Sequence, residues 1–153
     1  MTHPEQTHPE RPNPRHHTRG IYPYRVDLQS RFGDNDMFGH FNNAAYNLYI
    51  QEVICRFLMD EIQVDWRSDE FLTYAAETLC RFYAPIEYPE LVEGRLRIER
   101  LGRTSITYGI GLFVAGRETP AAAGHFVHVI VDPKTEKPIT IPDRVRTILG
   151  RFL

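Results

Sequence analysis

Residues 31–46 read RFGDNDMFGHFNNAAY, a loop interrupted by glycines that runs directly into an apolar helix pattern. Two aspartates, a histidine and a pair of adjacent asparagines crowd this loop. The start of a helix offers backbone N–H groups without intrahelical acceptors, together with the positive end of the helix dipole. A carboxylate held there can work beside a ready-made site for developing negative charge. The stretch therefore predicts acyl chemistry.

The residues on either side of the loop predict a strand and a long helix. From Tyr22 to Gln29, apolar and polar residues alternate with the period of a half-buried strand, which we expect to span about residues 21–32. After the loop, residues 44–62 carry apolar side chains at helical spacing around much of the cylinder. We therefore expect a long helix that is largely enclosed.

The rest of the chain predicts four more strands and a short terminal helix. The strand patterns cover residues 72–83, 91–101, 104–114 and 121–131, with glycine and proline between them. Such short links favour antiparallel neighbours. Residues 141–153 have the spacing of a short helix. The element order predicts an α+β domain in which a curved, five-stranded antiparallel sheet wraps one long central helix.

Length and composition fit one domain preceded by a tail. The chain has 153 residues, of which 42% are apolar, enough for a sizeable core. Residues 1–20 hold four of the seven histidines and four prolines but almost nothing apolar. So few apolar side chains cannot bury enough surface to offset the conformational entropy lost on ordering. We therefore expect a flexible tail at 1–20 and a single domain at 21–153.

Charge and cysteine content exclude several classes of function. The formal net charge is −2, so no global attraction to nucleic acid or anionic membrane is expected. The sequence contains no apolar run long enough for a membrane span and no secretory signal, which makes the cytoplasm the expected location. Cys55 and Cys80 are too few for a disulfide framework or a zinc site, and we expect both to be reduced core residues.

Two apparent motifs fail on inspection. Asp34 and Asp36 hint at a calcium loop, but Phe38 stands where an oxygen ligand should be and Ala45 where the closing glutamate belongs. The glycines at 109–111 lie inside a strand pattern and lack the third glycine of a dinucleotide fingerprint. Strand packing explains them better, and no metal or cofactor site is predicted.

The domain from about Tyr22 onward resembles the hotdog-fold acyl-CoA thioesterases of the 4-hydroxybenzoyl-CoA thioesterase type. The family's loop pattern is aromatic-x-D-x-D-x-x-G-H-x-N-N-x-x-Y. Its positions are occupied here by Phe32, Asp34, Asp36, Gly39, His40, Asn42, Asn43 and Tyr46. The resemblance implies the hotdog fold, a homodimer or dimer of dimers paired edge to edge, and active sites at the subunit interface.

The resemblance also implies an activity and its central residue. The expected reaction is hydrolysis of an acyl-CoA or acyl-carrier-protein thioester to a free acid and a thiol, without a cofactor, because coenzyme A is part of the substrate. The family's catalytic carboxylate corresponds to Asp36, which would act either as a nucleophile through a mixed anhydride or as a general base on water. The backbone N–H near Asn43 would stabilise the developing oxyanion.

The other loop residues have structural as well as functional interpretations. Asp34 is expected to organise the loop through hydrogen bonds. His40 could orient Asp36, transfer a proton or merely contact the helix. Asn42 or Asn43 fits a helix N-cap, although an amide could also position water. Asn42 and Tyr46 are candidates for substrate binding.

Two departures from a simple assignment stay open. The run from Gly39 to Asn43 looks more like the branch of long-chain acyl-CoA and plant acyl-carrier thioesterases, so His40 and Asn43 join Asp36 as catalytic candidates. A hotdog domain could instead bind acyl-CoA without turnover or hydrate an enoyl-CoA. Coenzyme A phosphates require cations, and five arginines are available on or between the strands: Arg81, Arg95, Arg97, Arg100 and Arg103.

Overall fold

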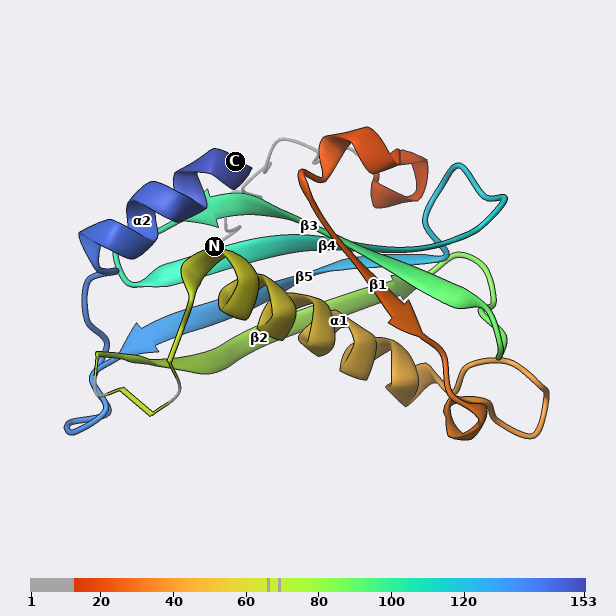
Figure 1. The fold of residues 1–153 in the computed structure, drawn as a ribbon, viewed down its shortest axis with the longest axis horizontal. Helices are drawn as coiled ribbons and strands as arrows, with labels where there is room; N and C mark the ends of the chain where they lie inside the picture. Colours follow the sequence, from red (N-terminus) through yellow and green to blue (C-terminus); the bar gives the residue numbers. More distant parts are fainter. Residues whose placement is uncertain (1–12, 66, 69) are drawn as a thin grey trace, which may run out of the picture.

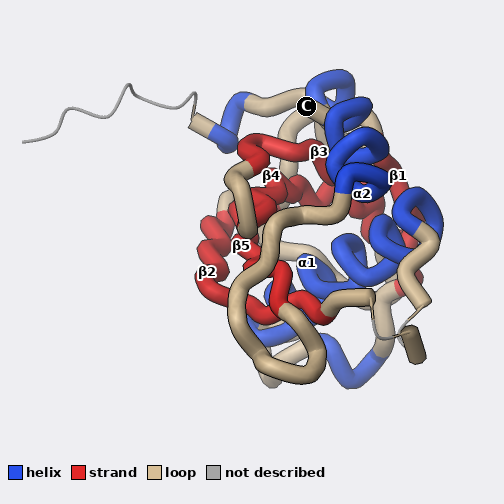
Figure 2. Tube along the Cα trace, turned by 90° about the vertical axis from the view of Figure 1, so that its left-hand side faces the viewer, coloured by secondary structure: helices blue, strands red, loops and turns tan. Residues whose placement is uncertain are grey.

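Five antiparallel strands wrap one long helix, as the sequence predicts. The structure, a computed structural model, describes residues 13–65, 67, 68 and 70–153. The strands are β1 (Tyr24–Gln29), β2 (Leu72–Phe82), β3 (Leu91–Leu101), β4 (Ser105–Val114) and β5 (Ala122–Val131), and the long helix is α1 (Asn43–Phe57). They form one sheet in the order β1-β3-β4-β5-β2, with every pair antiparallel. Figures 1 and 2 show α1 lying within the curve of the strands.

Strand β1 is shorter than predicted because turns form at both of its ends. The 3-10 turns η2 (Arg19–Ile21) and η3 (Phe32–Asp34) flank it. Pro23 lacks the N–H that a longer ladder would need. At the other end, the Arg31 N–H donates to Asp34 Oδ2 at 2.8 Å and closes the turn.

The C-terminal end of the long helix also differs from the prediction. The expected last residues form a π-helical turn, η4 (Leu58–Ile62), which ends at Gln63 with a left-handed φ of 55°. The predicted terminal helix is present as α2 (Asp143–Leu149) followed by the 3-10 turn η5 (Gly150–Phe152). The Phe152 ring packs edge-on against Phe57 at 4.9 Å, so the terminal helix closes the core at this end.

The buried face of α1 packs closely on the sheet. Ile50, Val53 and Phe57 are at most 1% exposed, and burying one such side chain is worth about 1.5–3 kcal/mol. Gly94 of β3 permits the close approach, because a Cβ there would lie 2.2 Å from Val53 Cγ2. The sheet and the helix thus meet at a position where only a hydrogen fits.

The opposite face of α1 is open, which corrects two expectations. Leu48 is 55% exposed, and Cys55 is exposed rather than buried in the core, while Cys80 of β2 is partly buried. Helical periodicity shows that apolar residues surround the cylinder, but the sheet covers only one side of it. Among the described residues, no helix is long and apolar enough to cross a membrane.

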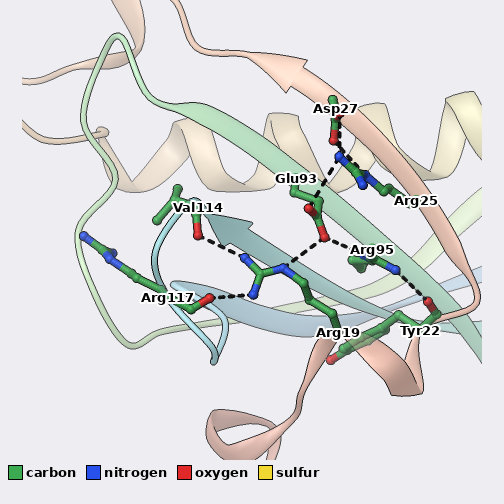
Figure 3. A network of polar contacts seen from close by, with 8 residues as sticks. All are labelled: Arg19, Tyr22, Arg25, Asp27, Glu93, Arg95, Val114 and Arg117. Atoms are coloured by element: carbon green, nitrogen blue, oxygen red, sulfur yellow. Dashed lines mark hydrogen bonds and ion pairs between the residues drawn. The ribbon is translucent and has the colours of Figure 1, made fainter.

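The segment before β1 packs on the outer face of the sheet. Residues 1–12 of the expected tail lie outside the described residues, but residues 13–20 include a 3-10 turn, η1 (Pro14–His16), and a buried His17. His17 Nδ1 lies 2.9 Å from the Tyr22 hydroxyl. The Arg19 guanidinium contacts the Glu93 carboxylate at 3.1 Å and donates to the backbone carbonyls of Val114 and Arg117 (Figure 3). These long-range contacts order a segment that composition assigns to the tail.

Candidate active site

The loop between β1 and α1 is folded by its own hydrogen bonds. The Asp36 N–H donates to the His40 carbonyl at 2.7 Å, and the Gly39 N–H donates to the Asp36 carbonyl at 3.1 Å. Gly39 has a φ of 83°, which favours glycine. Asp36 Oδ1 accepts a hydrogen bond from the Phe38 N–H at 2.8 Å, which orients the carboxylate. Asp36 and His40 are therefore held at the two ends of one tight turn.

Asp34 holds the loop together, as the sequence predicts. Its side chain is 5% exposed and accepts hydrogen bonds from the Arg31 backbone, the Arg31 guanidinium and the Tyr49 hydroxyl. Burial alone would raise the pKa of Asp34, but the hydrogen bonds from Arg31 and Tyr49 outweigh it and hold the pKa below its usual value. Burial and the neighbouring Asp34 raise the pKa of Tyr49, so this phenol stays protonated as a donor.

The start of α1 is capped by Asn42. Its side-chain oxygen accepts from the Ala44 N–H at 2.9 Å, which confirms the capping interpretation for Asn42. Asn43 is the first residue of the helix. Its N–H belongs to the first turn, where backbone donors have no intrahelical acceptor. The helix therefore offers a donor close to Asp36 without breaking a bond of its own.

A cavity of about 580 Å³ gathers most of the predicted site residues. Its lining residues from the loop and helix are Asp36, Phe38, His40, Phe41, Asn43 and Tyr46, and those from the end of β2 and the following turn are Phe82, Tyr83, Ala84 and Pro85. Four of the five predicted site residues thus meet at one place, whereas Asn42 serves as the cap beside it. The aromatic walls suit an apolar group, and the rim is open because Phe38 is 77% exposed.

Tyr46 forms a wall of this cavity and also fixes the opposite side. Its hydroxyl accepts from the Ile86 N–H at 3.2 Å and lies 3.5 Å from the Ala84 carbonyl. Its ring packs edge-on against Phe82 at 5.0 Å. Burial raises the pKa of Tyr46, so the hydroxyl stays neutral in this position. The residue joins α1 to the β2–β3 connection while its ring faces the cavity.

The β2–β3 connection supplies residues that sequence reasoning did not assign to the site. The Phe41 N–H donates to the Ile86 carbonyl at 2.7 Å, and Glu87 Oε1 lies 3.3 Å from His40 Nε2. The proline turn after β2 indicates in the sequence where this connection begins. Nothing in the sequence, however, pairs Glu87 with a histidine in a distant loop. Only the sheet topology brings the two together.

None of the five arginines that were candidates for binding coenzyme A phosphates lines this cavity, and all five lie within the described residues. Arg95 and Arg97 pair with Glu93 and Glu99 on the strands, and Arg81 lines a separate cavity on the outer face of the sheet. Arg117 comes nearer, because its guanidinium donates to the Pro85 carbonyl at 2.7 Å. No group of three or more His, Cys, Asp or Glu side chains among residues 13–65, 67, 68 and 70–153 is placed to hold a metal ion.

Comparison with solved structures finds several with the same fold. The PA5185 protein of Pseudomonas aeruginosa is 31% identical, with a TM-score of 0.84 over 88% of this chain and 94% of that chain. A thioesterase of Thermus thermophilus, solved with coenzyme A and Zn, is 27% identical, with a TM-score of 0.72 over 84% of this chain and 98% of that chain. A 1,4-dihydroxy-2-naphthoyl-CoA thioesterase from Synechocystis is 15% identical, with a TM-score of 0.75 over 83% and 95%.

A search of curated proteins finds no match to the chain. The family assignment rests instead on the match of the sequence to a family model. Residues 30–149 match the family model described as the thioesterase-like superfamily, a range that extends from the loop before α1 to the end of α2. Together with the sheet wrapped around α1, this match confirms the hotdog fold that the resemblance implied. The chain belongs to the thioesterase-like superfamily.

Proposed function

We propose that the protein hydrolyses an acyl-CoA thioester to a free acid and coenzyme A, with Asp36 as the catalytic carboxylate. The observation that carries the proposal is the cavity shared by Asp36 and Asn43, the first residue of α1. Membership of the thioesterase-like superfamily supports thioester hydrolysis in general. Coenzyme A as the thiol is supported by the Thermus thermophilus relative, which was solved with that molecule. An acyl-carrier-protein thioester is the related alternative.

The chemistry follows from the two sides of the cavity. As a general base, Asp36 would take a proton from water while the water oxygen attacks the thioester carbonyl carbon. As a nucleophile, it would attack that carbon itself and form a mixed anhydride that water then hydrolyses. In both cases negative charge develops on the carbonyl oxygen, which the N–H of Asn43 and the dipole of α1 would stabilise. The aromatic walls would receive the acyl group.

We further propose that a second copy of the chain completes the site, as a homodimer or a dimer of dimers. β2 is an edge strand whose outer edge presents unpaired backbone groups, and it leads directly into the cavity. Met37, next to Asp36 in the chain, is 91% exposed, and Phe82 of β2, which lines the cavity, is 48% exposed. Exposed apolar residues next to an open strand edge favour a protein partner over water. A cytoplasmic location and independence from a cofactor also remain predictions from the sequence.

The test is a thiol-release assay over aryl, short-chain and long-chain acyl-CoAs and one acyl-carrier-protein thioester. We expect release from at least one substrate and a loss of about 10² to 10⁴ in rate for Asp36→Asn, the usual range for an acid–base group. Asp27→Asn is the matched control, because Asp27 is an exposed aspartate on β1 paired with Arg25. Wild-type turnover by Asp36→Asn would remove Asp36 from the mechanism.

The same assay separates the alternative functions. Tight binding of acyl-CoA without thiol release from any substrate would favour a non-catalytic acyl-CoA-binding protein. Loss of enoyl absorbance without thiol release would favour an enoyl-CoA hydratase. Either result would overturn the hydrolase proposal.

A further inference from the structure

The catalytic loop is clamped to the β2–β3 connection at three neighbouring positions. The Phe41 N–H donates to the Ile86 carbonyl at 2.7 Å. The Tyr88 N–H donates to Asn35 Oδ1 at 3.2 Å. Between these two hydrogen bonds, His40 Nε2 lies 3.3 Å from Glu87 Oε1. The side-chain contact is thus framed on both sides by hydrogen bonds that fix the distance between the segments.

Glu87 is held in place by its own turn. Its N–H donates to Glu90 Oε2 at 2.8 Å, and its carbonyl accepts from the Glu90 N–H at 2.8 Å. These bonds fix the backbone from which the Glu87 side chain extends to His40. The backbone at Glu87 is therefore fixed at a position from which its carboxylate reaches the imidazole of His40.

Only one of the two partners lines the cavity. His40 is among its lining residues together with Asp36, whereas Glu87 is not. Glu87 can therefore act on the reaction only through the histidine. A carboxylate on one ring nitrogen fixes the orientation and tautomer of an imidazole and stabilises the imidazolium that forms when the other nitrogen takes a proton.

We propose that Glu87 is a positioning residue that turns His40 Nε2 toward its carboxylate and leaves Nδ1 to exchange protons in the cavity. This inference rests on the proposed thioester hydrolysis and adds a proton donor for the leaving thiolate. It selects the proton-transfer interpretation of His40 over simple contact with the helix. In the general-base route, Asp36 activates water, and His40 completes the reaction by protonating the thiolate.

The proton steps balance without any further reactant. Asp36 takes one proton from water while the remaining hydroxyl bonds to the carbonyl carbon. The C–S bond then breaks, its electron pair stays on sulfur, and His40 gives its Nδ1 proton to that thiolate. The proton on Asp36 passes to Nδ1 and restores both groups. Water and thioester are thereby converted to acid and thiol, and nothing is oxidised or reduced.

Kinetics of Glu87→Ala test the role in the reaction. We expect kcat for thiol release to fall by about 10- to 100-fold, less than the 10² to 10⁴ typical of losing the acid–base group itself, with KM changed by less than about twofold. Glu87→Gln should show a smaller fall in kcat than Glu87→Ala, because the amide keeps the shape of the side chain but not its charge. The fold should persist, since both side chains are about half exposed and such pairs contribute little stability. Glu118→Ala, an exposed glutamate in the β4–β5 turn, is the matched control.

Nuclear magnetic resonance of ¹⁵N-histidine-labelled protein tests the pair without reference to activity. We expect the His40 ring, assigned with His40→Asn, to carry a proton on Nε2 in the wild type and to change its nitrogen shifts in Glu87→Ala but not in Glu118→Ala. Identical His40 shifts in wild type and Glu87→Ala would overturn the pairing, and unchanged kcat in Glu87→Ala would overturn its role. Glu87-dependent shifts in a protein that releases no thiol would refute the proposed function and reduce the pair to a structural contact.

Discussion

The hydroxyl of Tyr49 donates a hydrogen bond to the buried carboxylate of Asp34, which joins the middle of α1 to the loop in front of its own first turn. The loop is therefore anchored to the helix by a side chain that does not line the cavity. Tyr49→Phe should lower the free energy of unfolding by about 1–3 kcal/mol, because Asp34 loses a donor in a buried position. Urea denaturation measures the change.

Tyr74→Phe provides the matched control for that substitution. Tyr74 also donates to a carboxylate, Glu136, but it is 42% exposed, so water can replace its hydrogen bond. We expect a change within about 0.5 kcal/mol. Equal effects of the two substitutions would show that burial does not distinguish the two bonds.

Asp34 should also contribute to loss of stability in acid. Because the pKa of Asp34 is lower in the folded state, its contribution is complete above the unfolded pKa of about 3.9 and is lost as the pH falls through the folded value. Asp34→Asn should be less stable than the wild type at neutral pH, and the difference should shrink below about pH 4. A stability difference that stays constant from pH 7 to pH 3 would contradict this assignment.

His128 should make the protein lose stability over a higher pH range. Its ring packs against Phe126 at 4.8 Å and Tyr108 at 5.5 Å, and burial lowers the pKa of His128 from 6.5 to about 4. Below about pH 6.5 this histidine is protonated in the unfolded chain but stays neutral in the folded chain. The free energy of unfolding therefore falls by at most about 1.4 kcal/mol per pH unit as the pH is lowered toward 4. His128→Gln should flatten this part of the curve, measured by urea denaturation between pH 7 and 4.5. His125→Gln on the same strand controls for the loss of an imidazole, and an unchanged slope in His128→Gln would assign the effect elsewhere.

Gly94 and Val53 should be coupled. Gly94→Ala should destabilise the protein by about 1–3 kcal/mol, because its Cβ would lie 2.2 Å from Val53 Cγ2. Val53→Ala removes the obstructing methyl groups, so the double substitution should cost less than the sum of the single ones. Gly33→Ala, where nothing lies within 4 Å of the added Cβ, should be nearly neutral. Additive effects at Gly94 and Val53 in denaturation experiments would refute the coupling.

What could be predicted from the sequence is mostly local. The predicted N-cap at Asn42 or Asn43, the turn at Gly39 and the strand periodicities depend on neighbouring residues. The structure places the cap at Asn42, gives Gly39 a φ of 83° and forms all five strands, with β1 shorter than predicted. The loop motif also identified the residues that gather in the cavity, because four of its members lie within one turn and the following helix start. A local argument predicts the structural role of Asp34, whereas only the family resemblance singles out Asp36 as the catalytic candidate.

What could not be predicted depends on contacts between distant residues. Arg19 reaches Glu93 across 74 positions, so composition alone assigned an ordered segment to the tail. The helical pattern around Cys55 showed apolar surroundings but not which side the sheet would leave uncovered. Glu87 meets His40 because β1 pairs with β3, which sets Gln29, just before the loop, opposite Leu91, just after the β2–β3 connection.

β1 and β2 lie at opposite edges of the sheet, and this has a consequence for the cavity. One wall of the cavity is the loop after β1 together with the start of α1, and the other is the end of β2. The two walls touch although they come from opposite edges, because α1 lies within the curve of the sheet (Figure 2), and the centroid of the Tyr46 ring lies 5.0 Å from that of Phe82. The width of the cavity therefore depends on how α1 packs on the strands. A substitution that lifts α1 from the sheet, such as Gly94→Ala, would widen the cavity without changing any residue that lines it.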